Sequence, residues 1–295
     1  MRSYKRIVII VLWILSFFLL SSLWGFFLAI KPPRIISKIT PHDLGLPYEE
    51  ITFATRDALN LRGWFIPHSS ALTKGEGGVP SKAKTIILLH GYPADKGNIL
   101  PALAFLHGTY NLFLFDFRYF GKSEGSYSTA GAKEGEDLFA AIRFLKSRGI
   151  EEVGVWGFSM GGAVALMAAP RTPEVKAIVS ESSYARLDLL APQLYRFPLL
   201  KYPLGAFTRL WGKLLLGIDA RDASPVQSAQ TLTIPVLLIH SRSDMIIPFS
   251  HALLLKKALE KNPAAEFWFT DHLFHGELSS EYEKRIKDFF ARSLG

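Results

Sequence analysis

Ser159 stands between two glycines in the segment Gly157-Phe158-Ser159-Met160-Gly161, after a short apolar run and before a run of small residues. This pattern predicts a strand, a sharp turn and a helix, with both glycines needed because a side chain there would collide with the neighbouring strand or helix. Such a nucleophile elbow exposes the hydroxyl and points the first helical amides toward an oxyanion formed beside it. The five-residue pattern alone is weak, because a serine that merely caps the helix would look the same.

A serine hydroxyl needs a histidine to take its proton and a carboxylate to orient that histidine. Asp244 follows a buried run that begins at Pro235, at the strand end where open α/β sheets place their sites. An aspartate there is more often a turn former or a helix cap, but the upstream serine and downstream histidines favour the role of acid. Two histidines, His272 and His275, follow the last expected strand. We favour His272 as the base, because it lies three residues past the last apolar strand residue, whereas His275 could be a surface or helix-cap residue.

A second polar segment, His90-Gly91-Tyr92, follows the first strong parallel strand. Gly91 would let the backbone approach the serine, so the amides of Tyr92 and Met160 are the expected oxyanion donors. We expect His90 to brace this loop. Asp116 and Arg118, which follow the next strand, are expected to lock loops through charge-assisted hydrogen bonds.

No metal and no cofactor are expected. The four candidate histidines, 90, 240, 272 and 275, contain no pair with helical i, i+4 spacing, and each has a simpler role. The chain has neither a Walker glycine loop nor a G-x-G-x-x-G after a strand, so nucleotide cofactors are not indicated.

Alternating strand and helix patterns surround these residues and predict a mostly parallel sheet with helices on both faces. An opening hairpin is expected over 49 to 54 and 59 to 66, followed by a mobile loop over 69 to 82. Further strands are expected at 84 to 89, 111 to 116, 152 to 156, 176 to 181, 234 to 240 and 265 to 269. Helices are expected near 97 to 107, 132 to 148, 160 to 169, 248 to 261 and 277 to 292.

The N-terminus carries a candidate membrane span. The 295-residue chain is 49% hydrophobic, enough for one large core, and residues 7 to 30 contain no charge. At about 1.5 Å per residue, this run can cross a bilayer core of about 30 Å. A cleaved signal peptide is the main alternative, but no clean small-x-small site precedes Lys31, so we favour an uncleaved anchor over a signal peptide or a buried soluble helix. Residues 1 to 30 are then the basic flank and anchor, 31 to 48 a proline-stiffened linker, and 49 to 295 the catalytic domain.

The net charge of +8 belongs to the flanks of this span, because residues 1 to 38 hold six basic residues and no acidic one. The rest of the chain is nearly neutral, so a membrane is the expected partner and nucleic acid is not. Three basic residues on each side leave the orientation open. Signal anchors of this kind commonly keep a short basic N-terminus in the cytoplasm, which predicts a catalytic domain on the extracytoplasmic face. The absence of cysteine excludes disulfides and thiolate chemistry and does not fix the compartment.

Residues 183 to 217 interrupt the alternation with a basic, leucine-rich insertion. The simplest prediction is a helical cap over the site. Its apolar face could pack on the core, or part of it could touch lipid or bind an acyl chain.

Taken together, His90-Gly91, Asp116-x-Arg118 with Gly121-x-Ser123, Gly157-x-Ser159-x-Gly161, Asp244 with Pro248, and Thr270-Asp271-His272 resemble the α/β-hydrolase superfamily over about 45 to 293. The resemblance is closest to the prolyl-oligopeptidase-like and serine-aminopeptidase-like branch, which has membrane-anchored members acting on lysophospholipids, monoacylglycerols or acylated proteins. It implies an α/β-hydrolase fold with Ser159 as nucleophile, Asp244 as acid and His272 as base. Two departures stand out: Tyr119-Phe120 where relatives usually have a glycine, and Phe269-Thr-Asp where relatives commonly carry Gly-x-Gly before the base.

The leading hypothesis is a membrane-anchored serine hydrolase acting on carboxylic esters or thioesters, with a small-molecule or lipid-like acyl substrate. A serine peptidase or amidase with the same triad, or a membrane-tethered binding module without catalysis, are the alternatives. The sequence does not indicate an oligomeric state.

Overall fold

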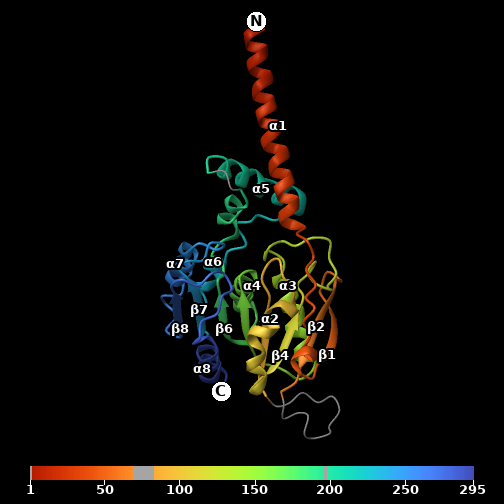
Figure 1. Cartoon of the computed structure of the whole chain (residues 1–295), viewed down its shortest axis with the longest axis vertical. Coiled ribbons are helices and arrows are strands. Elements are labelled where there is room, and N and C mark those ends of the chain that lie inside the picture. The colour runs from red at the N-terminus through yellow and green to blue at the C-terminus, as the bar shows by residue number, and fades with distance from the viewer. Residues whose placement is uncertain (1, 69–82, 196–197) are drawn as a thin grey trace.

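A computed structural model describes residues 2–68, 83–195 and 198–295 of the chain. The loop expected over 69 to 82 lies outside the described residues. Figure 1 shows a body built around a sheet, from which one long helix, α1 (Arg2–Ile30), projects.

The body contains an eight-stranded sheet in the order β1-β2-β4-β3-β5-β6-β7-β8. The first two strands, β1 (Glu49–Ala54) and β2 (Asn60–Ile66), form the expected hairpin, and β2 also pairs antiparallel with β4 (Asn111–Phe115). The other strands are parallel: β3 (Thr85–Leu89), β5 (Val153–Phe158), β6 (Val175–Glu181), β7 (Val236–Ser241) and β8 (Ala265–Thr270). The predicted α/β-hydrolase fold, with its mostly parallel sheet, is confirmed.

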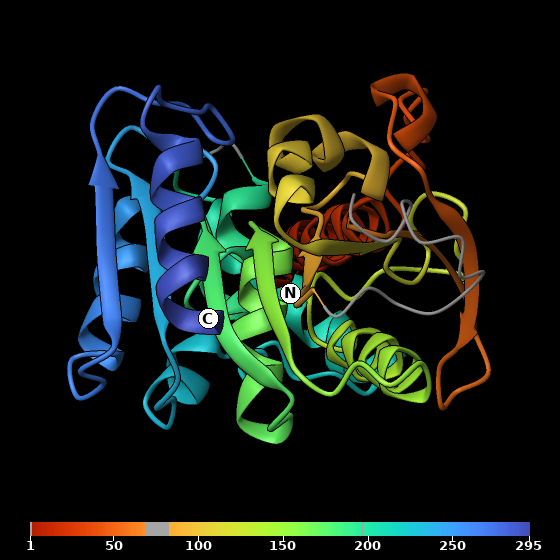
Figure 2. The ribbon, with the colours of Figure 1, turned by 90° about the horizontal axis from the view of Figure 1, so that it is seen from below.

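Helices cover both faces of the sheet (Figure 2), which explains why the strands β3, β4 and β7 are buried along their whole length. One face packs against α3 (Gly135–Ser147), α4 (Met160–Ala168) and α7 (Phe249–Ala258), through residues such as Leu138, Val164 and Leu255. The other packs against α2 (Lys96–Leu103) and α8 (Tyr282–Leu294), through residues such as Leu100 and Phe289. The short helix α6 (Pro225–Ala229) lies beside α4 and α7. Short 3-10 turns, η3 (Ala104–Gly108) and η4 (Ala169–Arg171), follow α2 and α4.

The terminal helix begins five residues later than predicted, at Tyr282 instead of residue 277. The segment between β8 and α8 is therefore a loop of eleven residues, 271 to 281. This difference decides which histidine reaches the site.

Within its described residues, the insertion predicted at 183 to 217 contains the 3-10 turns η5 (Leu187–Leu189) and η6 (Ala191–Leu194) and the helix α5 (Lys201–Leu216). In Figure 1, α5 lies beside the lower part of α1, and the two helices are in contact. The predicted linker includes a short helix, η1 (Pro41–Leu44). The amide of Ser37, which precedes this helix in the linker, donates to Asp95 at 2.7 Å.

Candidate active site

Ser159 occupies a sharp turn between β5 and α4, with φ 52° and ψ −114°. Few residues other than glycine adopt a positive φ, so the surrounding structure must hold this conformation. A Cβ at Gly157 would overlap the backbone of Gly161, and one at Gly161 would overlap the carbonyl of Leu89. The predicted need for both glycines is confirmed, and Ser159 occupies the sharp strand-to-helix turn that the pattern predicts.

The loops that follow two further strands bring a carboxylate and a histidine together. Nδ1 of His275 lies 2.7 Å from Oδ2 of Asp244, while Oδ1 of Asp244 accepts hydrogen bonds from the amides of Ile246 and Ile247. Burial alone would raise the pKa of Asp244, but the hydrogen bonds from His275 and the two amides outweigh it, and the pKa lies below its ordinary value. An ionised carboxylate held in this way fixes the orientation of the imidazole.

The preference for His272 is therefore wrong: the histidine that pairs with Asp244 is His275. The loop after β8 turns sharply at His272, which has φ 68° and an exposed side chain, and it then folds back through hydrogen bonds between Phe274 and Glu277. A histidine two residues beyond the strand points away before the loop returns. The loop expected from the sequence was shorter, because the last helix was predicted to begin at residue 277 and begins at Tyr282.

One signal for His275 was present in the sequence, namely the glycine that follows it. Gly276 has φ 81°, and a Cβ there would come within 3.1 Å of the Phe158 ring. The same ring lies 4.7 Å from the ring of His275, centroid to centroid. Gly276 thus lets the loop approach Phe158, the residue before Ser159. This approach brings His275 close to the elbow.

The loop after β3 approaches the same serine. A Cβ on Gly91 would lie 3.2 Å from Cβ of Ser159 and 2.9 Å from Phe158, so the backbone before Tyr92 is close to the elbow. Tyr92 and Met160 line the cavity that Ser159 also lines. Met160 is the first residue of α4, where amides have no partner within the helix. The expected donors therefore lie on the two segments that flank the serine.

His90 holds this loop, as predicted. It is fully buried, its Nε2 accepts from the amide of Phe117, and its Nδ1 lies 2.7 Å from the carbonyl of Gly91. The accepting Nε2 requires the proton on Nδ1, and burial lowers the pKa of the ring, so the imidazole is neutral.

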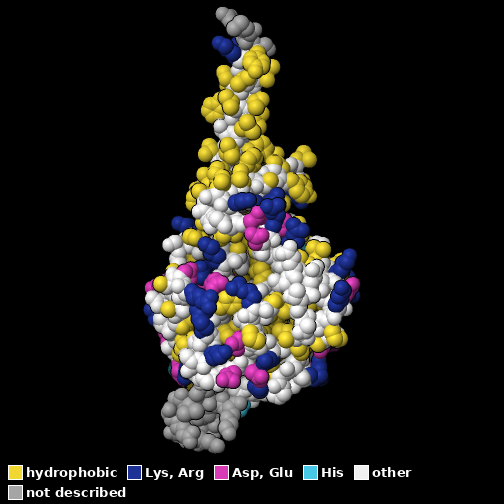
Figure 3. Space-filling model, turned by 180° about the vertical axis from the view of Figure 1, so that it is seen from behind, with side chains coloured by type: hydrophobic (Ala, Val, Ile, Leu, Met, Phe, Trp, Pro, Cys, Tyr) yellow, Lys and Arg dark blue, Asp and Glu magenta, His cyan; other side chains and the backbone are white. Residues whose placement is uncertain are grey.

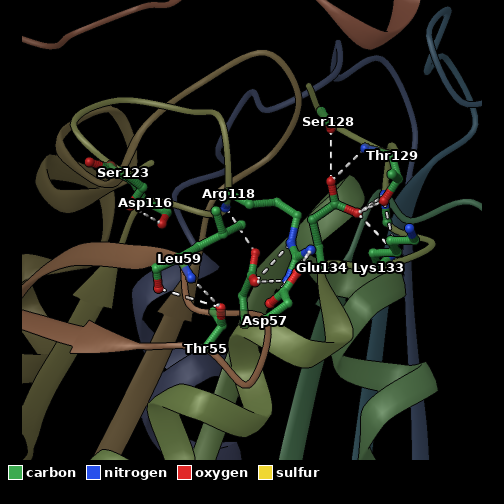
Figure 4. A network of polar contacts seen from close by, with 12 residues as sticks. Thr55, Asp57, Leu59, Asp116, Arg118, Ser123, Ser128, Thr129, Lys133 and Glu134 are labelled. Carbon is green, nitrogen blue, oxygen red and sulfur yellow. Dashed lines mark hydrogen bonds and ion pairs between the residues drawn. The ribbon is translucent and has the colours of Figure 1, made fainter. Parts of the chain in front are cut away.

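Asp116 and Arg118 lock loops through ion pairs, also as predicted. Asp116 is fully buried and binds the ammonium of Lys96 at 2.6 Å, while Arg118 pairs with Asp57 and with buried Asp137. Figure 4 shows Arg118 reaching toward Asp57 and, beside them, Glu134 holding Ser128 and Thr129. Glu134 also accepts from the amide of Gly131, so the loop 128 to 131 is held by one buried carboxylate. This loop contributes Thr129 and Ala130 to the cavity beside Ser159.

A buried acid behind the elbow was not anticipated. The carbonyl of Glu181 accepts from the amide of Ser159 at 2.8 Å, and its carboxyl accepts from the hydroxyl of Tyr282, which itself accepts from Nε1 of Trp156. Burial, and secondarily the charge of Asp244, raise the pKa of Glu181 to about 7 despite the hydrogen bond from Tyr282. Glu181 positions the elbow from below. No sequence pattern distinguished it from an ordinary strand-end residue.

A mostly apolar cavity of about 380 Å³ opens above Ser159. Its walls come from the cap, from the loop after β7 and from α1, which supplies Phe26, Ala29 and Ile30. The volume is within the range of small-molecule sites. Among the described residues, no group of three or more histidine, cysteine, aspartate or glutamate side chains could hold a metal ion.

Comparison with known proteins agrees with this fold. A sequence profile described as alpha/beta hydrolase fold matches residues 84–205. The chain is 29% identical over 256 residues to an uncharacterized protein, YfhR, of Escherichia coli strain K12. The alignment covers 83% of this chain and 81% of that protein. It is 36% identical over 140 residues, 45% of this chain and 41% of the relative, to the thiohydrolase aneE of Aspergillus aculeatus.

The fold is also found in a solved structure, the esterase Pf2001 of Pyrococcus furiosus, with a TM-score of 0.73 and 28% identity over 90% of this chain and all of that one. The chain has the α/β-hydrolase fold, and the matched profile and the esterase structure support its membership of that superfamily. Its fold and its relatives support hydrolase activity.

Proposed function

We propose that the chain is a membrane-anchored serine hydrolase that cleaves carboxylic esters or thioesters of lipid-like acyl groups. The observation that carries the proposal is the 2.7 Å pair of Asp244 and His275 beside the elbow of Ser159. The imidazole of His275 lies 4.7 Å, centroid to centroid, from the ring of Phe158, the residue before Ser159. The esterase Pf2001 and the thiohydrolase aneE support hydrolysis of acyl bonds to oxygen or sulfur.

In the proposed mechanism, His275 takes the proton of Ser159 as Oγ attacks the acyl carbonyl, and Asp244 stabilises the resulting imidazolium. The amides of Tyr92 and Met160 donate to the oxyanion of the tetrahedral intermediate. The intermediate collapses, the leaving group receives the proton from His275, and an acyl-enzyme on Ser159 remains. Water, deprotonated by His275, then attacks this ester through a second tetrahedral intermediate and releases the acid.

The membrane part of the proposal rests on α1. Its residues Tyr4–Ile30 have a mean hydropathy of 2.6 and are long enough to cross a bilayer. The last turns of this helix are bound to the body: the hydroxyl of Tyr92 donates to the carbonyl of Ala29 at 2.8 Å, and the amide of Ser128 donates to that of Ile30 at 2.8 Å. A helix held by such contacts favours an anchor that is retained over a signal peptide that is removed. We place the catalytic domain on the extracytoplasmic face, which protease protection in sealed vesicles tests.

Full-length protein, purified in detergent, tests the chemistry. It should label with a fluorophosphonate, hydrolyse acyl esters and thioesters, and prefer both to aminoacyl amides. The variant Ser159→Ala should neither label nor hydrolyse these substrates. Preference for amides would replace the proposal with a peptidase. A wild-type protein that neither labels nor turns over any substrate would favour a binding module.

A further inference from the structure

The helix α1, which the proposed function treats as a membrane anchor, also lines the cavity above Ser159. Phe26, Ala29 and Ile30 lie on the last two turns of α1 and line the cavity. Phe26 and Ile30 are buried there, whereas Phe27 and Leu28 on the same turns are exposed. The end of the helix therefore serves as a wall of the site on one face.

Specific contacts hold this wall in place. Besides the hydrogen bonds at Ala29 and Ile30, Nε1 of Trp211 on α5 donates to Oγ of buried Ser22 at 3.0 Å. Gly25 faces Tyr195 so closely that an added Cβ would lie 2.5 Å from its hydroxyl. On α5, a Cβ at Gly212 would lie 3.8 Å from the ring of Phe26, at ordinary van der Waals distance. The helix and the cap are fitted to each other over the last three turns of α1.

A second hollow, of about 620 Å³, runs along the outer side of this contact. Its walls are the apolar side chains of α1 and of the cap, among them Phe17, Leu20, Trp24, Leu200 and Leu204. Leu194, at the end of η6 and 48% exposed, lines both this groove and the cavity of Ser159. The groove and the active-site cavity thus share Leu194 as a common wall.

The groove lies on the part of the molecule that a bilayer would contact. Figure 3 shows hydrophobic side chains along α1 that continue onto the adjoining cap, with charged side chains gathered below them. On the cap, Leu199, Leu210, Leu214 and Leu215 are exposed. Exposed apolar side chains of this density, next to a helix able to span a membrane, favour burial in lipid over contact with water.

We propose that the fatty-acyl chain of a membrane lipid enters the site sideways from the bilayer, along the groove between α1 and the cap, passes Leu194 and ends its path against Phe26, Ala29 and Ile30. This inference rests on the proposed function and adds the origin and path of the substrate. The anchor then determines chain-length specificity. A chain drawn from lipid never crosses water, so the hydrophobic cost of extracting it is avoided.

Two positions on the same turn of α1 provide a matched test. Ala29→Trp fills the cavity, while the carbonyl that binds Tyr92 is unchanged. Phe27→Trp places the same side chain on the exposed face, at a position that lines neither the cavity nor the groove. Each methylene kept out of an apolar site costs about fourfold in affinity. In Ala29→Trp, the ratio of kcat/KM for a decanoyl ester to that for an acetyl ester should fall at least about tenfold, since two or more methylenes are displaced. Phe27→Trp should keep the wild-type ratio. Equal ratios in the two variants would overturn the inference.

A covalent probe maps the path without relying on chain-length preference. Fluorophosphonates with decyl or hexadecyl chains carry a diazirine at the chain end; Oγ of Ser159 displaces fluoride, and light then links the chain end to its neighbours. In wild-type protein in phosphatidylcholine nanodiscs, the hexadecyl end should label the groove, at residues such as Leu20 or Trp24. The decyl end should label the cavity. Met245 and Ile246, in the loop after β7, also line the cavity and are exposed. Hexadecyl labels confined to these two residues would show that the chain leaves toward water and would overturn the inference. A protein that does not react with either probe refutes the proposed function instead, so the two failures are distinguishable.

Discussion

Replacement of His275 by alanine should abolish turnover, whereas replacement of His272 should leave it within about twofold of wild type, as expected of a surface substitution. His275 is the residue whose Nδ1 lies 2.7 Å from Asp244, and His272 is exposed on the same loop. The two variants remove the same side chain from positions three residues apart, so each controls for the other.

The size of the effect follows from the role of the residue. Without a base, acyl transfer relies on the oxyanion donors and on binding, and kcat falls by about 10⁴ to 10⁶. That corresponds to about 5 to 8 kcal/mol of lost transition-state stabilisation. The effect on folding is smaller, because Asp244 keeps two backbone donors after His275 is removed. Loss of one hydrogen bond to a charged group costs about 1.5 to 3 kcal/mol.

The assay combines steady-state hydrolysis of a short acyl ester with the rate of fluorophosphonate labelling and the thermal unfolding midpoint. We expect His275→Ala to lose both activities while remaining folded. Retained activity in His275→Ala, together with loss in His272→Ala, would refute the assignment and return the base to His272. If both variants kept their activity, another group would have to activate Ser159.

Three further outcomes follow from the described contacts. Asp244→Asn should lower kcat by about 10⁴, because an amide cannot stabilise the imidazolium, and Tm should change little; an unchanged kcat would exclude Asp244 as the acid. Lys96→Met leaves the fully buried Asp116 without its 2.6 Å cation and should cost about 3 to 5 kcal/mol of unfolding free energy in urea titrations; a cost under 1 kcal/mol would mean that the loop lock is dispensable. Glu181→Gln should alter the pH dependence of stability. The folded protein holds a proton on Glu181 up to about pH 7, whereas the unfolded chain releases it near 4.5, so wild-type stability should lose about 3 kcal/mol between those values. Glu181→Gln should lose less over the same range, and parallel curves would contradict the raised pKa of Glu181.

The sheet was predictable because its signals are local. Each parallel strand is an apolar run of five to seven residues between polar turns, and the elbow glycines are required by contacts within the same turn. His90 and Asp116 were assigned structural roles from their places directly after buried strands, and their contacts agree. The position of a residue that directly follows a strand can thus be predicted from the strand itself.

The histidine could not be placed in this way, because its position depends on the path of an eleven-residue loop. That path is set by contacts distant in sequence: Asp244 from the loop after β7, and Phe158 beside the elbow. Lys96, Asp57 and Asp137, the partners of the two loop-locking residues, were missed for the same reason. Periodicity reports which side of an element is buried but not which distant group it meets.

The apolar N-terminal run illustrates a different limit. Hydropathy indicates that residues 7 to 30 can cross a membrane, and it treats every position in the run alike. Yet Ser22 and Gly25 occupy the side that meets the cap, where they permit the hydrogen bond from Trp211 and the close approach of Tyr195. A helix that served only as an anchor would not need these residues, since any apolar side chain would suit lipid. Their positions therefore support an anchor whose last turns have a second task, which is to form one wall of the cavity over Ser159.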